Sequence, residues 1–267
     1  MQEFLNKTVF ITGAAKGQGR GVALAFAKEG ANIIAFDLGE KLCYPAYNRS
    51  CGDDLCKLKA EVEALGAQIE ICAGDVRNSN DVITAVDTGI KRFGAIDVLF
   101  NNAGICAYGL SWELTEDEWD TMMDINLKGA WLVSKYVVPH MIEKKSGVII
   151  NNSSVGGLRG MNRLSHYAAS KFGMIGLTKS QAIELAPYGI RAVSIHPTGV
   201  DTPMNDGLAE MEGATAIEIA TRSAGNLIPV PWIEVEDVAN SVLFLASEKA
   251  RFITGSQFVL DAGLLTR

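Results

Sequence analysis

Four residues in the middle of the chain could together move a proton: Asn126, Ser154, Tyr167 and Lys171. Tyr167 and Lys171 are four residues apart, so in a helix their side chains share one face. A nearby ammonium favours phenolate, and we expect it to lower the pKa of this tyrosine from its usual value of about 10. Such a group suits general acid–base chemistry on an alcohol/ketone pair. A tyrosine and a lysine at this spacing also occur on ordinary helix surfaces, so the interpretation depends on the rest of the chain.

A glycine-rich turn near the N-terminus is typical of a dinucleotide site. The predicted strand Lys7–Thr12 leads into Gly13-Ala-Ala-Lys-Gly17-Gln-Gly19, then a helix, and then a strand that ends at Asp37. Glycines allow a close approach to a pyrophosphate, and the following helix N-terminus attracts negative charge. The acid at the end of the second strand can bind ribose hydroxyls. The alternative is a glycine turn that binds no ligand.

Length and composition are typical of one globular α/β domain. The chain has 267 residues, 48% hydrophobic content, 27 glycines and a net charge of −7. This charge disfavours binding to nucleic acids or anionic membranes. The sequence has no apolar run of roughly 20 residues and no signal-peptide pattern, so we expect a cytoplasmic protein.

The five cysteines carry no metal-site spacing. Cys43, Cys51 and Cys56 are close together, but paired C-x₂-C motifs are missing. We expect reduced thiols that bind no metal.

Strand and helix patterns alternate along the whole chain, which predicts a parallel sheet covered on both faces. We expect an α/β fold: a single doubly wound, parallel, seven-stranded sheet (Rossmann fold) in one domain over residues 1–267. The expected strands are 7–12, 32–37, 68–74, 97–101, 147–152, 190–195 and 256–260, and the expected helices are 17–29, 53–65, 79–93, 115–144, 166–187 and 234–247. The stretch Leu38–Gly52 is longer than this alternation requires, and such loops are often functional.

The ordered motifs resemble the short-chain dehydrogenase/reductase family in its classical-length branch. The matching residues are Thr12–Gly19, Asp75-Val76, Asn101–Gly104, Asn126, Ser154, Tyr167, Lys171 and Pro197-Thr-Gly199. Ser154 lies thirteen residues before Tyr167, the family's usual interval, which favours it over Ser153.

Shorter marks resemble the carveol-dehydrogenase-like, mycofactocin-associated branch, although bacterial hydroxysteroid dehydrogenases share much of this framework. In that branch the loop after Asp37 is implied to fold over the nucleotide and slow its exchange. The marks are Gly17-Gln18-Gly19, the loop itself, Arg77, Pro231-Trp232, Thr254-Gly255 and Asp261-Ala-Gly263.

The family resemblance implies a role for each matched residue. Tyr167 takes the alcohol proton, and Ser154 binds the substrate oxygen. Lys171 lowers the pKa of the tyrosine and binds the nicotinamide ribose, and Asn126 holds a water. Ser154 and Tyr167 are thus the implied substrate contacts. The implied cofactor contacts are Gly13, Lys16, Gly17, Gln18, Gly19, Asp37, Leu38, Asp75, Val76, Asn102, Ala103, Gly104, Tyr167, Lys171, Pro197, Gly199, Val200 and Thr202.

Charge near the ribose site favours NAD over NADP. The carboxylate of Asp37 repels a 2′-phosphate, and the next three residues include no arginine to neutralise it. Lys16 in the glycine turn is the counter-evidence, since a basic residue there can hold NADP.

The variable segment 203–230 is the family's lid over the substrate, and its apolar residues favour a bulky hydrophobic alcohol. A steroid, a bile acid or a cyclic terpenoid alcohol is expected, ahead of fatty-acyl or sugar substrates. A reductase of acyl-carrier thioesters and an NAD-sensing protein without turnover are the alternatives. The pocket candidates are Met204, Leu208, Met211, Ile217, Ile219, Leu227, Tyr108, Trp112, Val155, Leu158 and Met161, with Arg159, Arg163 and Arg222 at the rim; each could instead be ordinary packing.

Two expectations concern larger surfaces. Apolar residues on several faces of 115–144 and 166–187, with the family resemblance, imply a homotetramer. In the loop, Tyr44, Pro45 and Tyr47 are expected to cover the adenosine half of the cofactor, and Arg49 could meet a phosphate. The alternative is a surface loop without ligand contact.

Overall fold

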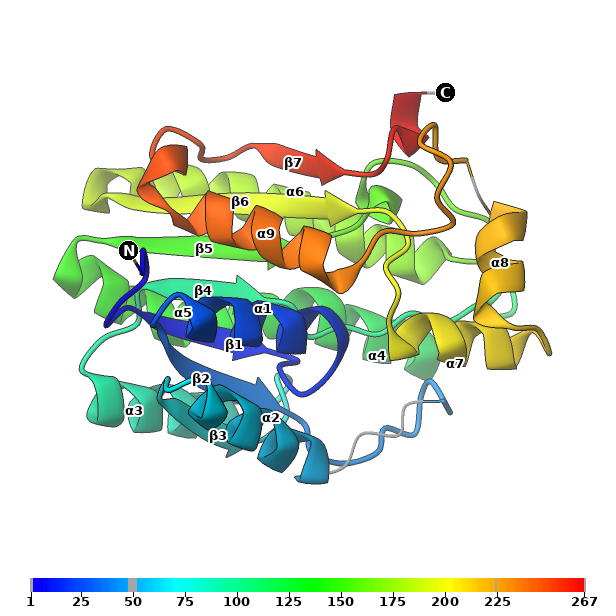
Figure 1. The fold of residues 1–267 in the computed structure, drawn as a ribbon. Helices are drawn as coiled ribbons and strands as arrows, with labels where there is room; N and C mark the ends of the chain where they lie inside the picture. Colours follow the sequence, from blue (N-terminus) through cyan, green and yellow to red (C-terminus); the bar gives the residue numbers. More distant parts are fainter. Residues whose placement is uncertain (1, 48–51, 224, 267) are drawn as a thin grey trace.

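Seven parallel strands form one sheet in the order β3-β2-β1-β4-β5-β6-β7 (Figure 1). The computed structural model describes residues 2–47, 52–223 and 225–266. Within these residues the predicted seven-stranded, doubly wound sheet is confirmed. The strands are β1 Thr8–Thr12, β2 Asn32–Asp37, β3 Ile69–Ala73, β4 Val98–Asn101, β5 Gly147–Asn152, β6 Ile190–Pro197 and β7 Gln257–Leu260.

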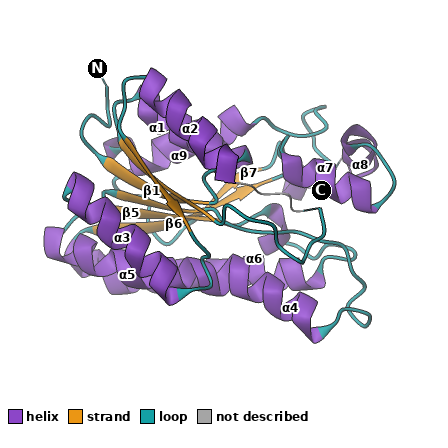
Figure 2. Ribbon diagram, turned by 90° about the horizontal axis from the view of Figure 1, so that it is seen from below, coloured by secondary structure: helices purple, strands orange, loops and turns teal. Residues whose placement is uncertain are grey.

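Helices cover both faces of this sheet (Figure 2). One apolar cluster joins α1, α2 and α9 to the sheet, and a second joins α3 and α5 to the opposite face. The central strands β1, β4 and β5 are mostly apolar because both of their faces are buried, and their polar residues lie near the strand ends. The helices are α1 Gly17–Lys28, α2 Gly52–Ala64, α3 Ser79–Phe93, α4 Glu116–Met123, α5 Gly129–Lys144, α6 Ser165–Leu185, α7 Pro203–Met211, α8 Ala216–Ser223 and α9 Val235–Ala246.

Strand β1 lies between β2 and β4, where the chain changes direction across the sheet. In sheets of this kind ligands bind beyond the carboxyl ends of the strands at such a switch point. Thr12 and Asn101, the last residues of β1 and β4, are both buried there.

The helix expected over 115–144 is interrupted in the structure. The Thr115 side chain and Glu118 form a reciprocal capping box that starts α4. A π-helical turn over Asp124–Lys128 then separates α4 from α5. Such turns are rare and occur frequently at functional sites, and this one contains Asn126.

The variable segment 203–230 contains α7 and α8, which the sequence analysis did not predict as helices. Pro203 occupies the first turn of α7, where a missing N–H costs no helical hydrogen bond.

The loop after β2 is described as far as Tyr47. Arg49 and Cys51 lie outside the described residues. Cys43, Cys56, Cys72 and Cys106 are free thiols, and in the described part of the chain no group of side chains could hold a metal ion. None of the described helices is long and apolar enough to cross a bilayer.

Candidate active site

A cavity of about 410 Å³ lies beyond the carboxyl ends of the strands. It extends from the glycine turn to α7 and contains Tyr167 and Lys171. Most of the predicted cofactor contacts line this cavity: Gly13, Lys16, Gly17, Gln18, Asp37, Leu38, Asp75, Val76, Asn102, Ala103, Gly104, Tyr167, Lys171 and Thr202. The predicted contacts that do not line it are Gly19, Pro197, Gly199 and Val200.

The glycine turn has the geometry that a dinucleotide requires. Gly13 and Gly17 both have positive φ, 63° and 51°, in the left-handed region that glycine tolerates. A Cβ atom at Gly19 would lie 2.1 Å from the Gly13 carbonyl oxygen. Gly19 therefore packs against the backbone of the turn itself, which explains why it does not line the cavity. Backbone N–H groups at the start of α1 can then face a pyrophosphate.

Asp37 stands at the end of β2 beside this turn. Its Oδ2 accepts a hydrogen bond from the Ala15 N–H at 2.9 Å. Burial raises the pKa of Asp37, and backbone hydrogen bonds and Lys16 partly oppose that rise. The Nζ of Lys16 pairs with a carboxylate oxygen of Asp54 at 2.9 Å. The lysine that could have favoured NADP therefore already has an acidic partner on α2.

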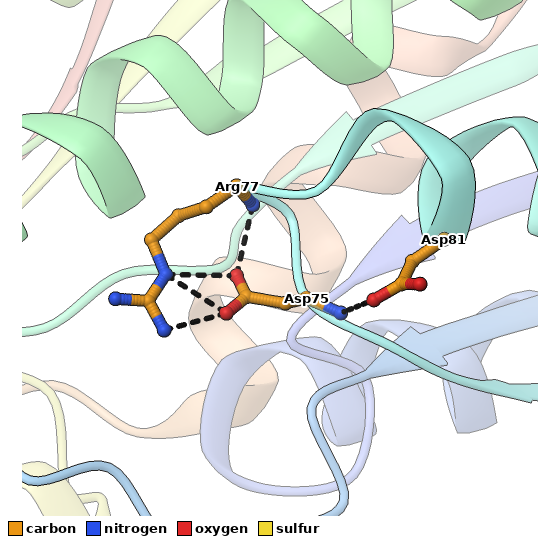
Figure 3. A network of polar contacts seen from close by, with 3 residues as sticks. All are labelled: Asp75, Arg77 and Asp81. Carbon is orange, nitrogen blue, oxygen red and sulfur yellow. Dashed lines mark hydrogen bonds and ion pairs between the residues drawn. The ribbon is translucent and has the colours of Figure 1, made fainter.

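Asp75, a predicted cofactor contact, is held by Arg77 (Figure 3). The guanidinium donates to both carboxylate oxygens of Asp75: Nε to Oδ1 at 3.0 Å and to Oδ2 at 2.8 Å, and Nη2 to Oδ2 at 2.5 Å. The Asp81 carboxylate accepts the Asp75 N–H at 2.9 Å. Asp75 lines the cavity, but any ligand donor must share its oxygens with Arg77. The sequence marked Arg77 only as a family feature and did not indicate this pairing.

Tyr167 and Lys171 line one end of the cavity together with Ser153, and Ser154 lies behind them in contact with Tyr167 without lining the cavity. A side-chain hydrogen bond connects Tyr167 with Ser154, whose Oγ also accepts the Gly156 N–H at 3.0 Å. The Nζ of Lys171 lies 5.7 Å from the centroid of the Tyr167 ring and donates to the Asn152 carbonyl oxygen at 2.8 Å. Ser154 therefore caps the short turn Val155–Gly157 with the same hydroxyl that contacts Tyr167.

The protonation pattern differs from the sequence-based prediction. Burial raises the pKa of Tyr167, although its hydrogen bond to Ser154 opposes this. Burial lowers the pKa of Lys171 to about 8. The expected lowering of the tyrosine pKa is wrong, because desolvation of the buried phenol is the largest contribution to its pKa.

Asn126 is buried in the π-helical turn and fixes the chain after β4. Its Oδ1 accepts the Ile105 N–H at 2.8 Å, and its Nδ2 donates to the Ile105 carbonyl at 2.9 Å. The same Nδ2 contacts the Ser170 hydroxyl at 3.1 Å. The side chain thus ties the cavity wall to α6, and its expected role in holding a water stays a prediction.

Asn152, which the sequence analysis did not single out, connects the glycine turn to Lys171. Asn102 donates to the carbonyls of Thr12 and Gly13 at 3.0 and 3.1 Å, so its oxygen faces Asn152. The Nδ2 of Asn152 donates to that oxygen and to Oε1 of Gln18, both at 2.9 Å. The only signal in the sequence was its place at the end of β5, two residues before Ser154.

An apolar cluster next to Tyr167 forms the other half of the site. Of the predicted pocket residues, Val155 is buried elsewhere, Trp112 is 77% exposed, and Met211, Ile217 and Leu227 are also exposed. The cluster consists of Cys106, Leu164 and Leu208 with Tyr47, Tyr108, Met161, Tyr167 and Met204.

Among the arginines proposed for the rim, Arg163 is already paired. Its Nη1 contacts Glu212 at 2.9 Å, and its guanidinium lies 5.2 Å from the centroid of the Tyr108 ring. Arg159 is exposed, and the side chain of Arg222 lies outside the described residues.

The loop after β2 is placed differently from the expectation. The Tyr47 hydroxyl donates to the Cys106 carbonyl at 2.5 Å, and the Tyr44 hydroxyl lies 2.9 Å from Nε2 of His166. These contacts direct both tyrosines toward the Tyr167 end of the cavity, not toward an adenosine cover near Asp37.

Fold and site together define a dinucleotide-dependent oxidoreductase. A family profile described as enoyl-(acyl carrier protein) reductase matches residues 13–265. The chain belongs to the short-chain dehydrogenase/reductase family.

Proteins that are similar to this chain include carveol dehydrogenases. A (−)-trans-carveol dehydrogenase from Rhodococcus erythropolis is 40% identical over 268 residues, which are 96% of each chain. The crystal structure of carveol dehydrogenase from Mycobacterium avium in complex with NAD has a TM-score of 0.94 at 36% identity and covers 99% of both chains. A short chain dehydrogenase from Mycobacterium paratuberculosis bound to NAD has a TM-score of 0.92 at 35% identity, covering 99% of this chain and all of the other.

Proposed function

We propose that this protein is an NAD-dependent dehydrogenase that interconverts a bulky hydrophobic secondary alcohol and its ketone. The observation that carries this proposal is a cavity with Tyr167 and Lys171 at one end, where Ser154 is hydrogen-bonded to Tyr167, and with the glycine turn and Asp37 at the other end. NAD bound to the two similar solved proteins supports the choice of cofactor.

The chain's own groups position the alcohol and move its proton. The Ser154 hydroxyl orients the substrate oxygen and stabilises its developing charge. Tyr167 exchanges a proton with that oxygen, and Lys171 stabilises the negative charge on the phenol as the proton moves. NAD, when bound, supplies the hydride acceptor, and the residues of the glycine turn and Asp37 would hold it.

The substrate proposal rests on the apolar cluster beside Tyr167. Leucine, methionine and tyrosine side chains surround the reacting end, and adaptable apolar side chains suit a bulky hydrocarbon ring. The carveol dehydrogenase relatives favour a cyclic terpenoid alcohol, ahead of a steroid or a bile acid.

A reductase of acyl-carrier thioesters is the second candidate, and the description of the matching family profile favours it. Such enzymes usually prefer NADP and must attract an acidic carrier. The carboxylate at Asp37 disfavours NADP, and the net charge of −7 disfavours the attraction of an acidic carrier. A protein that senses NAD without turnover would have no need for the Ser154, Tyr167 and Lys171 arrangement.

The deciding experiment is a panel of cyclic terpenoid alcohols, hydroxysteroids, bile acids and an acyl-carrier thioester, followed by nicotinamide absorbance with NAD and NADP in parallel. We expect turnover of cyclic alcohols with NAD, and almost none in Tyr167→Phe, which keeps nucleotide affinity because only the transferable proton is lost. Faster turnover with NADP, or substantial activity in Tyr167→Phe, would refute the proposal.

Cofactor choice is tested separately by Asp37→Ala. Removing this carboxylate should weaken NAD and relieve repulsion of NADP, so the preference ratio should fall by roughly tenfold or more. Lys16→Ala is the matched control, because its ammonium is already paired with Asp54. A larger change in Lys16→Ala than in Asp37→Ala would contradict this assignment.

We further propose that residues 1–267 act as one nucleotide-binding domain, with 203–230 as its substrate lid, and that the protein assembles as a homotetramer. The cytoplasmic location stays a prediction from the sequence.

A further inference from the structure

The segment after β2 lies across the substrate end of the cavity. In Figure 1 it runs from the end of β2 toward α7. Two tyrosines attach it there: the Tyr47 hydroxyl to the carbonyl of Cys106, and the Tyr44 hydroxyl to the ring of His166, the residue before Tyr167. Cys106 and His166 belong to separate parts of the fold, so the segment bridges two walls of the same site.

The ring of Tyr47 is packed against α7. A Cβ atom at Gly207 would lie 2.2 Å from Cδ2 of that ring and 2.3 Å from its Cγ. These distances are shorter than any real carbon contact, so only glycine at position 207 admits the ring where it lies. Gly207 does not have a positive φ, and a helix interior disfavours glycine. The approach of Tyr47 therefore accounts for this glycine.

Tyr47 also belongs to the apolar cluster around Tyr167. It shares this cluster with Leu208 and Met204 of α7, and it lines the cavity together with Leu42 of the same segment. Its hydroxyl is already used by the Cys106 carbonyl. Tyr47 therefore presents an apolar ring, fixed at both ends, to the space beside the reacting atoms.

The geometry points to Tyr47 as a specificity-determining residue, a fixed wall that limits the bulk of the alcohol beside Tyr167. This inference rests on the proposed function. A rigid aromatic wall selects by shape, and one methylene group more or less in an apolar pocket changes kcat/KM by roughly 10- to 200-fold. The chain thus sets its substrate range with a residue outside the lid at 203–230.

The test compares kcat/KM for a small and a bulky cyclic secondary alcohol at saturating NAD. Tyr47→Ala should shift the bulky-to-small ratio by about tenfold or more toward the bulky alcohol. Tyr47→Phe keeps the wall and should change the ratio less than about threefold. Tyr44→Phe is the matched control, because it releases the same segment at His166 without removing the wall.

Gly207→Ala displaces the Tyr47 ring from the side of α7 and so tests the same wall independently. Its added methyl must displace the Tyr47 ring, so this variant should alter the alcohol ratio while Tyr47 is still present. In the background of Tyr47→Ala the methyl has space, and Gly207→Ala should then have little further effect. Such non-additivity is the signature of a direct contact.

Nucleotide affinity, measured by NADH fluorescence titration, separates this role from a cofactor cover. Tyr47→Ala should change NADH affinity by less than about threefold. A large loss of NADH affinity with an unchanged alcohol ratio would overturn the inference, as would a ratio shift of equal size in Tyr44→Phe. Turnover of none of the alcohols by the wild type would refute the proposed function, whereas turnover with an unchanged ratio in Tyr47→Ala would refute only the wall.

Discussion

Burial shifts the pKa values of Lys171 and Tyr167 in opposite directions. Both side chains enter a desolvated end of the cavity, which favours the neutral form of each group. The phenol therefore keeps its proton more tightly, while the pKa of Lys171 falls to about 8. As pH rises, the first proton to leave these two groups comes from the lysine. Their capacity to accept a proton therefore appears above the lowered pKa of Lys171.

We predict that alcohol oxidation rises with pH through about 8 and that ketone reduction falls over the same window. Oxidation delivers a proton to the pair, so the deprotonated form is the active one; reduction needs the proton present. The measurement is kcat/KM from about pH 6 to about pH 10 in both directions. Lys171→Met should abolish the inflection near 8, whereas Lys128→Met, on an exposed salt-bridged lysine, should keep it. An inflection near 8 in Lys171→Met would assign it to another group.

At the scale of elements, close helix contacts are built on glycines. Gly21 of α1 faces Val235 at the start of α9, and a Cβ atom there would lie 2.1 Å from Cγ1 of the valine. Valine is β-branched and stiff, so it cannot rotate away easily. This contact holds α1, whose N-terminus belongs to the glycine turn, against α9 in the apolar cluster on that face of the sheet.

We predict that Gly21→Ala destabilises the protein by about 1–3 kcal/mol through overpacking, although alanine favours helices. Chemical denaturation at fixed protein concentration measures the effect. Val235→Ala removes the clashing methyl group, so the double variant should be more stable than the sum of the two single changes indicates. Simple additivity of the two substitutions would show that this helix contact is not the cause.

For the whole molecule, one side of α6 exposes two large apolar side chains, with Lys179 and Ser180 also exposed between them. Phe172 is 47% exposed and Ile183 is 78% exposed, and eleven residues are close to three helical turns, so both lie on one side. Gly176 lies between them with open space around its position, and Trp131 on α5 is also exposed. Exposed large apolar side chains with a small residue between them favour close packing of a second copy, in line with the proposed symmetric tetramer.

We predict that light scattering at micromolar concentration gives a mass well above the 28.6 kDa of one chain. Phe172→Glu combined with Ile183→Glu should lower that mass, because buried unpaired carboxylates oppose association. Leu5→Glu, on a residue that is exposed near the N-terminus, should leave it unchanged. A wild-type mass equal to one chain would disprove the tetramer.

The sequence by itself determined the parallel sheet and the membership of the family, both of which are confirmed. It also located the glycine turn and the acid at Asp37, whose contacts with the cofactor stay predictions. These features are local: buried strands need apolar runs, tight turns need glycine, and the spacing of Ser154, Tyr167 and Lys171 is set along the chain. The predicted catalytic roles remain to be tested by the variants above.

Only the tertiary structure decided which distant groups meet. Tyr47 bonds to a carbonyl 59 residues away, and Asn152 to a side chain 134 residues away. The π-helical break at Asn126 and the raised pKa of Tyr167 likewise depend on packing from several elements. Periodicity and propensity describe neighbours along the chain, whereas desolvation and hydrogen-bond direction depend on everything that surrounds an atom. For that reason the sequence placed the loop tyrosines over the adenosine, and the structure places them beside Tyr167.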